Sequence, residues 1–268
     1  MESEATADAL RVYWQPGCSS CLRVKEYLEA QGVAYVSRNV LADPLGFEEL
    51  QRLGLRQVPI VTRGGRYANG QVLADVARLA GLGVPPAKLL PPDLLGERLQ
   101  ATLAISASGL RQFPEQLLGR QFLDRPRTVA DLIFHIFNVA DALVELQEGL
   151  PLSYASYNRV PAPTPEGSAL RGELIVYGSS VSARIQAFFS RPHNAAEWAS
   201  RADVYYGVQT LHQFLERTTW HCLQHSRQLL SLLSDAGVEP VVPMDDQMLQ
   251  GLPLPNEVWD ADQVRKVR

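Results

Sequence analysis

The chain has 268 residues, a net charge of −4 and an apolar fraction of 46%. This length exceeds that of one small domain and favours two domains. No apolar run approaches the about 20 residues that a membrane helix needs, and no long basic run indicates a nucleic-acid partner. The start, Met1-Glu2-Ser3-Glu4, lacks the basic and apolar stretches of a signal peptide. Three cysteines in a chain of this size argue against a disulfide scaffold and favour the reducing cytoplasm.

The first part of the chain alternates strand and helix patterns. Strand-like runs cover 10–14, 34–40, 58–62 and 66–68, and helical periodicity covers 19–31, 45–53 and 72–79. The order βαβαββα predicts an α/β domain with a small mixed sheet over residues 1–82. Residues 83–92 contain four prolines. Because proline interrupts helices and central strands, this stretch is the expected linker.

Residues 93–268 have the pattern of an all-α domain. Amphipathic helices are predicted at 94–112, 128–146, 169–189 and 208–233. Thr128 is expected to cap the second of these helices, with Asp131 three residues later. Residues 150–167 are expected to form a long crossing loop. Four helices with one long crossover predict a four-helix bundle, and the tail from Val238 is expected to pack across it.

Cys18 and Cys21 form a Cys-x-x-Cys motif where the first predicted strand turns into the first predicted helix. At that position the first sulfur lies over unpaired backbone N–H groups and the positive end of the helix dipole. Both effects lower the pKa of a thiol and favour the reactive thiolate. The second sulfur lies one turn on, where it can resolve a mixed disulfide. A buried cysteine pair or half of a zinc site is the alternative, although the third cysteine, Cys222, is far along the chain.

The order of elements, the Pro-Gly-Cys-Ser-Ser-Cys turn and the Val-Pro pair at Pro59 together resemble the glutaredoxin branch of the thioredoxin-like fold over residues 8–82. The resemblance implies that Pro59 is cis and lies beside the active thiol, where it exposes backbone to a thiol substrate. It also implies that Cys18 is the nucleophile and Cys21 the resolving thiol. Gly70 matches the thiol-binding region. No acidic residue or second glycine follows Gly70 directly, so a thioredoxin reductase or another low-molecular-weight thiol is an alternative to glutathione.

Three of the five histidines lie in two predicted helices that could face each other. His221 and His225 are four residues apart, so both imidazoles lie on one helix face, about 40° apart. His135 on a facing helix would complete three metal ligands. Histidines buried in the bundle core are the alternative. Zinc, nickel, iron and manganese all suit three imidazoles with open positions, and zinc is slightly favoured.

One helix carries the run Thr-Val-Ala-Asp-Leu-Ile-Phe-His, and the last long helix carries His-x-x-x-His-x-Arg-Gln. These runs resemble the DinB/YfiT-type metalloproteins over about residues 93–235. The resemblance implies that a divalent metal is bound by His135, His221 and His225. Several family members are transferases or isomerases that depend on a low-molecular-weight thiol. Arg227 is a candidate for orienting an anionic substrate, with a solvated helix surface as the alternative.

Together the two halves predict a thiol-disulfide oxidoreductase domain coupled to a metal-dependent, thiol transferase-like domain. The expected enzyme acts on a small electrophilic substrate by transfer, isomerisation or reductive cleavage, and the Cys-x-x-Cys domain supplies or recycles the thiol. A flexible tether would give the two domains an effective concentration on the order of mM, and one fixed orientation is the alternative because the linker is short and proline-rich. Alternatives are an oxidoreductase whose bundle is a binding or dimerisation module, and a redox or metal sensor. The expected partners are a small-molecule thiol, an unknown small substrate and a reductase for the dithiol, with a homodimer as a further expectation.

Overall fold

The computed structural model describes residues 8–84, 88–157, 159 and 167–261. The described chain divides into two compact units, one containing residues 8–84 and 255–261 and the other containing residues 88–254. Parts of the predicted linker, crossing loop and tail, at 85–87, 160–166 and 262–268, lie outside the described residues. No described helix is both long enough and apolar enough to cross a membrane.

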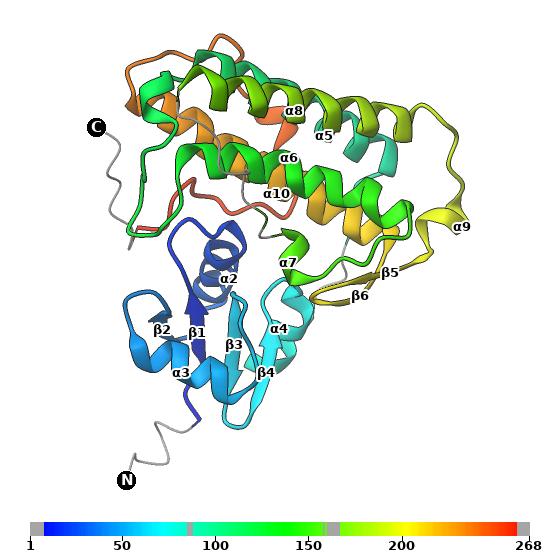
Figure 1. Cartoon of the computed structure of the whole chain (residues 1–268). Helices are drawn as coiled ribbons and strands as arrows, with labels where there is room; N and C mark the ends of the chain where they lie inside the picture. Colours follow the sequence, from blue (N-terminus) through cyan, green and yellow to red (C-terminus); the bar gives the residue numbers. More distant parts are fainter. Residues whose placement is uncertain (1–7, 85–87, 158, 160–166, 262–268) are drawn as a thin grey trace. The chain divides into compact units, whose positions relative to one another are not determined.

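The first unit is built on a four-stranded mixed sheet with the strand order β2-β1-β3-β4 (Figure 1). The strands are β1 (Arg11–Trp14), β2 (Val36–Asn39), β3 (Ile60–Arg63) and β4 (Arg66–Asn69), and the helices are α2 (Ser19–Ala30), α3 (Pro44–Arg52) and α4 (Leu73–Ala80). Strand β1 pairs in parallel with β2 and antiparallel with β3, which pairs antiparallel with β4. The predicted α/β fold with a small mixed sheet is therefore confirmed.

The core of the first unit follows from the alternation of side chains along β1. Val12 points into a cluster that contains Val24 of α2 and Val76 of α4. The next residue, Tyr13, points to the opposite face, where it packs with Leu50 of α3. Because successive strand residues face opposite sides of a sheet, one apolar strand supports helices on both faces. This arrangement holds the turn that follows β1, which carries both cysteines.

A late segment of the chain belongs to the first unit. The Glu26 carboxylate on α2 accepts hydrogen bonds from the backbone N–H groups of Asn256, at 2.6 Å, and Glu257, at 2.9 Å. Lys25 Nζ lies 2.6 Å from the Asp260 carboxylate, and both side chains are buried. The sequence pattern predicts that this stretch packs across the helical bundle. The structure instead attaches residues 255–261 to α2, where charged groups supply their partners.

The second unit contains four long helices that pack against one another in a closed ring. They are α5 (Pro92–Gln112), α6 (Val129–Gln147), α8 (Ser168–Phe189) and α10 (Leu211–Asp235). Helix α5 contacts α10, α10 contacts α6, α6 contacts α8, and α8 contacts α5 (Figure 1). The predicted cap of α6 is present as a capping box, in which Thr128 and Asp131 each bond the other's backbone. The prediction of packed long helices in the second half is confirmed.

Shorter elements join these helices, and most of them escape the sequence analysis. They are η1 (Glu115–Leu117), α7 (Tyr154–Tyr157), α9 (Ala195–Trp198), β5 (Arg201–Val204), β6 (Gly207–Thr210) and η2 (Asp246–Met248). Strands β5 and β6 form a hairpin that ends where α10 begins. The predicted start of the last helix at Val208 is therefore wrong by three residues. Thr210 caps the helix in a box with Gln213, so the chain before Thr210 is extended.

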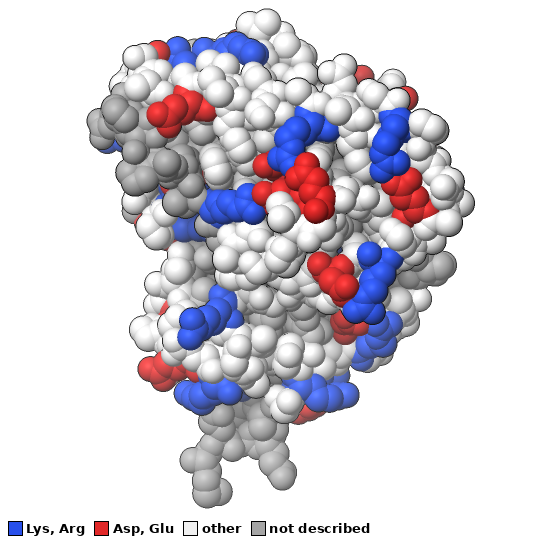
Figure 2. Space-filling view, turned by 45° about the vertical axis from the view of Figure 1, so that its right-hand side comes forward, with Lys and Arg blue, Asp and Glu red and all other residues white. Residues whose placement is uncertain are grey.

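The surface carries both signs of charge. On the face drawn in Figure 2, lysine and arginine side chains are interspersed with aspartate and glutamate side chains, often as neighbours. This pattern agrees with the near balance of 25 basic and 29 acidic residues in the whole chain. The absence of a nucleic-acid partner stays a prediction.

We predict that Gly70→Ala lowers the free energy of unfolding by about 1–3 kcal/mol, because it overpacks a closed space. A β-carbon at Gly70 would lie 2.7 Å from Pro59 Cγ and 2.8 Å from Val24 Cγ2. Gly65→Ala is the matched control, because nothing lies within 4 Å of its added β-carbon. Thermal unfolding followed by circular dichroism measures both variants. Equal midpoints for the two variants would contradict the packing argument.

Candidate functional site

The first candidate site is the turn between β1 and α2. Cys18 is the N-cap of α2, and its Sγ accepts a hydrogen bond from the Cys21 backbone N–H at 3.2 Å. The two cysteines are joined by a disulfide, with their Cα atoms 5.2 Å apart. Cys18 therefore has the position at the positive helix end that favours a thiolate once the disulfide is reduced. The role of Cys18 as the nucleophile remains a prediction, as does the role of Cys21 as the resolving thiol.

The segment around Pro59 is shaped by close packing. The Val58-Pro59 peptide is cis. The Gly70 N–H donates to the Pro59 carbonyl at 2.9 Å, and the glycine leaves no room for a side chain against the proline ring. The structure thus brings Pro59 and Gly70 together. It gives Gly70 a packing role, and a role in binding a thiol stays a prediction.

Gln71, which the sequence analysis does not single out, joins this segment to the cysteine-bearing helix. Its side-chain oxygen accepts a hydrogen bond from Ser20 Oγ at 2.9 Å. Its backbone carbonyl accepts from Arg23 Nη2 at 3.0 Å. Both contacts are buried, where a hydrogen bond that is left unmade is costly. They fix the first turn of α2 relative to the chain that follows β4.

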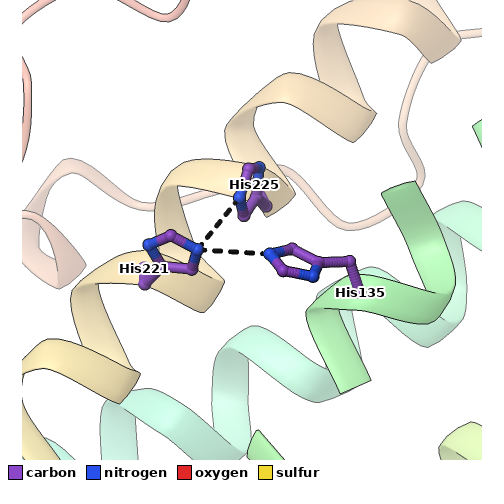
Figure 3. Close-up of side chains that lie close together, drawn as sticks. All are labelled: His135, His221 and His225. Carbon is purple, nitrogen blue, oxygen red and sulfur yellow. Dashed lines mark hydrogen bonds between the residues drawn. The ribbon is translucent and has the colours of Figure 1, made fainter. Parts of the chain in front are cut away.

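The second candidate site is a cluster of three histidines from two helices of the second unit (Figure 3). His135 lies on α6, and His221 and His225 lie one turn apart on α10. One ring nitrogen of each lies within 4.8 Å of the others. The Nε2 atom of His221 is 3.3 Å from that of His135 and 3.2 Å from that of His225. The sequence predicts all three histidines as a group, and the structure brings them together.

Gln228 fixes the orientation of one ring. Its side-chain oxygen lies 2.7 Å from Nδ1 of His225. An amide oxygen only accepts hydrogen bonds, so Nδ1 carries the hydrogen and Nε2 directs its lone pair into the cluster. A second partner of this kind is typical of metal-binding histidines. Asn138 and Gln224 lie near the histidines in the sequence and bond to the Ser156 carbonyl and to Arg227, respectively.

The electrostatics keep the cluster uncharged. Burial lowers the pKa of all three histidines well below the usual value, and the positive charges of Arg127 and Arg217 lower it further. Neutral imidazole is the form that binds metal ions. His221 and His225 are buried, whereas His135 on α6 is partly buried.

The donor set fits a divalent metal. Two edges of the cluster measure 3.2 and 3.3 Å between nitrogens. A tetrahedral zinc site with bonds of 2.0–2.1 Å has nitrogens roughly 3.3 Å apart. Cys222 is not part of the set. Its Sγ lies 3.3 Å from the Ile136 carbonyl, and burial raises the pKa of the thiol to about 12.

Arg227 does not face the histidines. It lies two residues beyond His225, about 200° around the helix, and its Nη1 donates to Gln224 at 2.6 Å. The charges that act on the histidines come from three other arginines, Arg125, Arg127 and Arg217. Arg217 is visible in the sequence as the residue one turn before His221. Arg125 and Arg127 lie in the segment before α6, and only the folded chain places them near α10.

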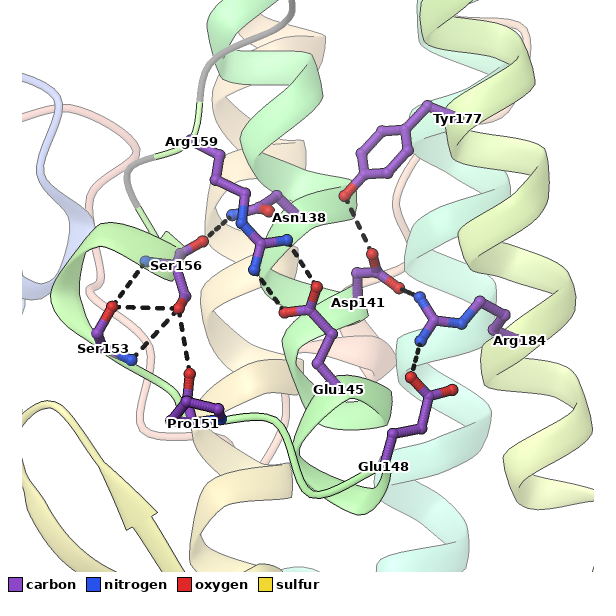
Figure 4. Close-up of polar contacts among 10 residues, drawn as sticks. All are labelled: Asn138, Asp141, Glu145, Glu148, Pro151, Ser153, Ser156, Arg159, Tyr177 and Arg184. Carbon is purple, nitrogen blue, oxygen red and sulfur yellow. Dashed lines mark hydrogen bonds and ion pairs between the residues drawn. The ribbon is translucent and has the colours of Figure 1, made fainter.

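A polar network anchors the short helix α7 and links α6 to α8 (Figure 4). The Asn138 amide donates to the Ser156 carbonyl of α7 at 2.9 Å. Arg159 makes two hydrogen bonds to the Glu145 carboxylate, at 2.6 and 2.8 Å. On the other side of α6, Arg184 of α8 pairs with Asp141 and with Glu148, the residue after α6. The network holds the tyrosines of α7 beside α6 and gives these arginines carboxylate partners.

We predict that the metal-free protein loses stability as the pH falls below about 6.5. The unfolded chain then binds protons at three histidines that the folded protein keeps neutral, because their folded pKa values are lowered. Each histidine contributes up to about 1.4 kcal/mol per pH unit. Urea unfolding of chelator-treated protein at pH 7.5, 6.5 and 5.5 measures the slope. His221→Gln removes one of these groups and should give a shallower slope, and an unchanged slope would contradict the assignment.

Two comparisons with known proteins give matches. Residues 10–68 match the family described as Glutaredoxin. The chain is also 38% identical, over 42 residues, to proteins named "Global transcriptional regulator Spx 1" from Bacillus cereus and Bacillus anthracis. That match covers 16% of this chain and 32% of each relative, so the chain spans about a third of the length of these curated relatives. The protein therefore has a glutaredoxin domain at residues 10–68, followed by a helical region with a cluster of three histidines.

Proposed function

We propose that the protein is a thiol-dependent metalloenzyme served by its own dithiol domain. The observation that carries this proposal is the convergence of three neutral imidazole nitrogens within 4.8 Å. Three protein ligands with an open position are typical of catalytic sites, whereas structural zinc sites are closed by four. The sequence likeness to DinB/YfiT-type metalloproteins supports the same function for the helical unit.

The helical unit would hold the metal through His135, His221 and His225, with Gln228 fixing one ring. A divalent metal bound there would supply a Lewis acid that lowers the pKa of a small thiol. Zinc is favoured slightly over nickel, iron and manganese, since all of them accept imidazole ligands. The buried thiol of Cys222 stays protonated and takes no part.

The glutaredoxin domain would return oxidised thiol to the reduced state. The Cys18 thiolate attacks the S–S bond of the thiol's disulfide, releases one thiol and forms a mixed disulfide. The Cys21 thiolate then displaces the second thiol. Two electrons pass to the small molecule, and the protein is left with the Cys18–Cys21 disulfide that the structure contains. An external reductase or thiol must restore the dithiol.

The fate of the thiol in each catalytic cycle distinguishes the three reaction classes, which are thiol transfer, thiol-assisted isomerisation and reductive cleavage. Thiol transfer consumes the thiol, and thiol-assisted isomerisation returns it unchanged. Reductive cleavage of a small electrophile oxidises two thiols in each cycle, because the substrate leaves with two electrons. A fused disulfide-reducing domain is of direct use only in the last class. Reductive cleavage is therefore the reaction that we favour for the whole chain.

A redox-sensing regulator is the second candidate function. It is favoured by the 38% identity to the two Spx 1 proteins, whose name describes transcriptional regulators. In that case the redox state of Cys18 and Cys21 would control binding to a partner. Such a sensor requires no metal at the histidines, so metal analysis separates the two candidates.

We predict that the purified protein binds one equivalent of a divalent metal. His221→Gln removes a central ligand of the cluster and should reduce the content to below about 0.1 equivalent, as expected for the loss of one of three ligands. His212→Gln is the matched control. It lies on the same helix, but its Nε2 is bonded to the Leu90 carbonyl at 2.7 Å. Elemental analysis after dialysis measures all three proteins. No metal in the wild type would refute the metalloenzyme proposal.

We predict that the reduced protein converts bis(2-hydroxyethyl) disulfide to two equivalents of 2-mercaptoethanol per chain. Cys18→Ser should release none, because the attacking thiolate is lost. Cys21→Ser should release one equivalent and retain the other as a mixed disulfide, visible as added mass. Cys222→Ser is the control and should match the wild type. Full release by Cys18→Ser would contradict the assigned nucleophile.

A further inference from the structure

Arg217 shares a helix face with two of the histidines. Residues 217, 221 and 225 are spaced by four, so each lies one turn of α10 from the next. The side chain is buried, with 6% of its surface exposed. Its positive charge lowers the pKa of all three histidines. A cation is therefore built into the lining of the candidate metal site.

No described carboxylate acts on Arg217, whose neighbours in the described part of the chain are tyrosines and Cys222. Its Nη2 donates to the Tyr205 hydroxyl at 3.4 Å. Its guanidinium carbon lies 5.0 Å from the ring centroid of Tyr157 and 5.6 Å from that of Tyr206. Burial raises the pKa of Tyr157 and Tyr205, so both phenols stay neutral. The tyrosines pack against the guanidinium and leave its charge unbalanced.

Two donor atoms of Arg217 lack an acceptor. Its Nε and Nη1 atoms are buried, and neither has a hydrogen-bond partner among the described residues. A buried donor without a partner costs roughly 1–3 kcal/mol, and more when it is charged. These donors need oxygen acceptors that the described part of the chain does not provide.

Arg127 adds a second positive charge that acts on the same histidines. Its charge lowers the pKa of His135, His221 and His225. Within the described residues its side chain has no carboxylate at ion-pair distance, and Asp131 acts on it only from farther away. Burial and the charge of Arg125 lower the pKa of Arg127, as expected for a guanidinium that is missing a counter-ion.

Three other arginines of the helical unit differ from Arg127 and Arg217, because each is bound by at least one carboxylate. Arg159 is bound by Glu145, and Arg184 by Asp141 and Glu148 (Figure 4). Arg171 lies 3.0 Å from Glu115. These three guanidinium groups have carboxylate partners within the protein. Among the described residues, Arg127 and Arg217 have no carboxylate at ion-pair distance, although their charges act on the histidine cluster.

We propose that Arg217 and Arg127 form a binding site for the carboxylate of a small-molecule ligand next to the histidine cluster. The proposal rests on the proposed metal-dependent function and specifies its ligand. A guanidinium group presents several donors in a plane and matches a carboxylate. Since tyrosine rings pack against the Arg217 guanidinium, the ligand reaches it at its N–H edge. The carboxylate belongs either to the thiol or to the electrophile, and the two sources are distinguished by experiment.

The first experiment measures thiol binding to the full-length protein loaded with cobalt(II), whose absorption reports thiolate coordination. The probes are 3-mercaptopropionate and its methyl ester, which differ by one negative charge. If the carboxylate belongs to the thiol, the acid binds at least tenfold more tightly than the ester. Arg217→Gln and Arg127→Gln should each reduce this ratio by at least threefold. Arg111→Gln, on the exposed surface of α5, removes the same charge and should leave the ratio unchanged.

The second experiment tests the electrophile as the source. Calorimetry measures the binding of succinate to cobalt-loaded protein saturated with the methyl ester. Binding that Arg217→Gln and Arg127→Gln weaken by at least threefold assigns the carboxylate to the electrophile. The proposal is overturned if acid and ester bind equally and succinate does not bind. It is also overturned if both arginine variants behave as the wild type.

Two further measurements keep these outcomes distinct. Because Arg217 is buried among tyrosines, Arg217→Gln could fail to fold, and two other variants then replace it in the binding experiments. Arg217→Lys keeps the positive charge, and Arg127→Gln changes a residue that is only partly buried. If the protein binds no cobalt, the metalloenzyme proposal fails by itself. Succinate calorimetry on the metal-free protein then still tests the carboxylate site. Arginine-dependent binding supports the site, and its absence refutes it.

Discussion

The rotational register of helix α10 is the constraint on which the second site depends. Arg217, His221 and His225 share one face because they are four residues apart, and a shift of one residue would turn all three by about 100°. The capping box of Thr210 and Gln213 fixes where the helix begins. Contacts with α5 and α6 fix which face turns inward. The position of His135 then depends only on the rotation of α6 about its axis, which the capping box of Thr128 and Asp131 fixes in the same way. Two local capping motifs thus determine the positions of three converging nitrogens.

Most of the fold and the grouping of the three histidines could be predicted from the sequence, because they depend on local sequence patterns. The strand and helix order, the Thr128 cap and the spacing of His221 and His225 are all readable over a few residues. The β5–β6 hairpin is missed because its strands have only four residues each, and their pattern merges with that of the following helix. Arg127 lies in the segment before α6, and the tyrosines of α7 lie in a stretch that the sequence pattern predicts to be a loop. Their place beside α10 depends on packing between distant segments, which no local pattern encodes. The attachment of residues 255–261 to α2 could not be predicted for the same reason, because it joins segments that are far apart in the sequence.

A helix terminus in the first unit and burial in the second unit have opposite effects on the pKa of a cysteine. At Cys18 the free end of α2 would stabilise a negative sulfur once the disulfide is reduced, as the predicted role of this cysteine as nucleophile requires. At Cys222 burial in the middle of α10 raises the pKa to about 12 and keeps the thiol inert. The position of a cysteine in its helix therefore decides its chemistry here. The proposed chemistry at the histidines would therefore need a thiol from outside the protein, since Cys222 of α10 is directed to the Ile136 carbonyl.

The charge balance at the histidines leads to the same requirement. Three neutral imidazoles give a divalent metal no negative charge, and the nearby guanidinium groups of Arg127 and Arg217 add to the positive sum. Like charges repel strongly in a buried site, where the dielectric constant is low. Anions bound beside the metal would therefore strengthen its binding. A thiolate on the metal and a carboxylate on the arginines would together supply two negative charges. Metal affinity and ligand affinity should consequently rise together, as linkage requires for sites that stabilise each other.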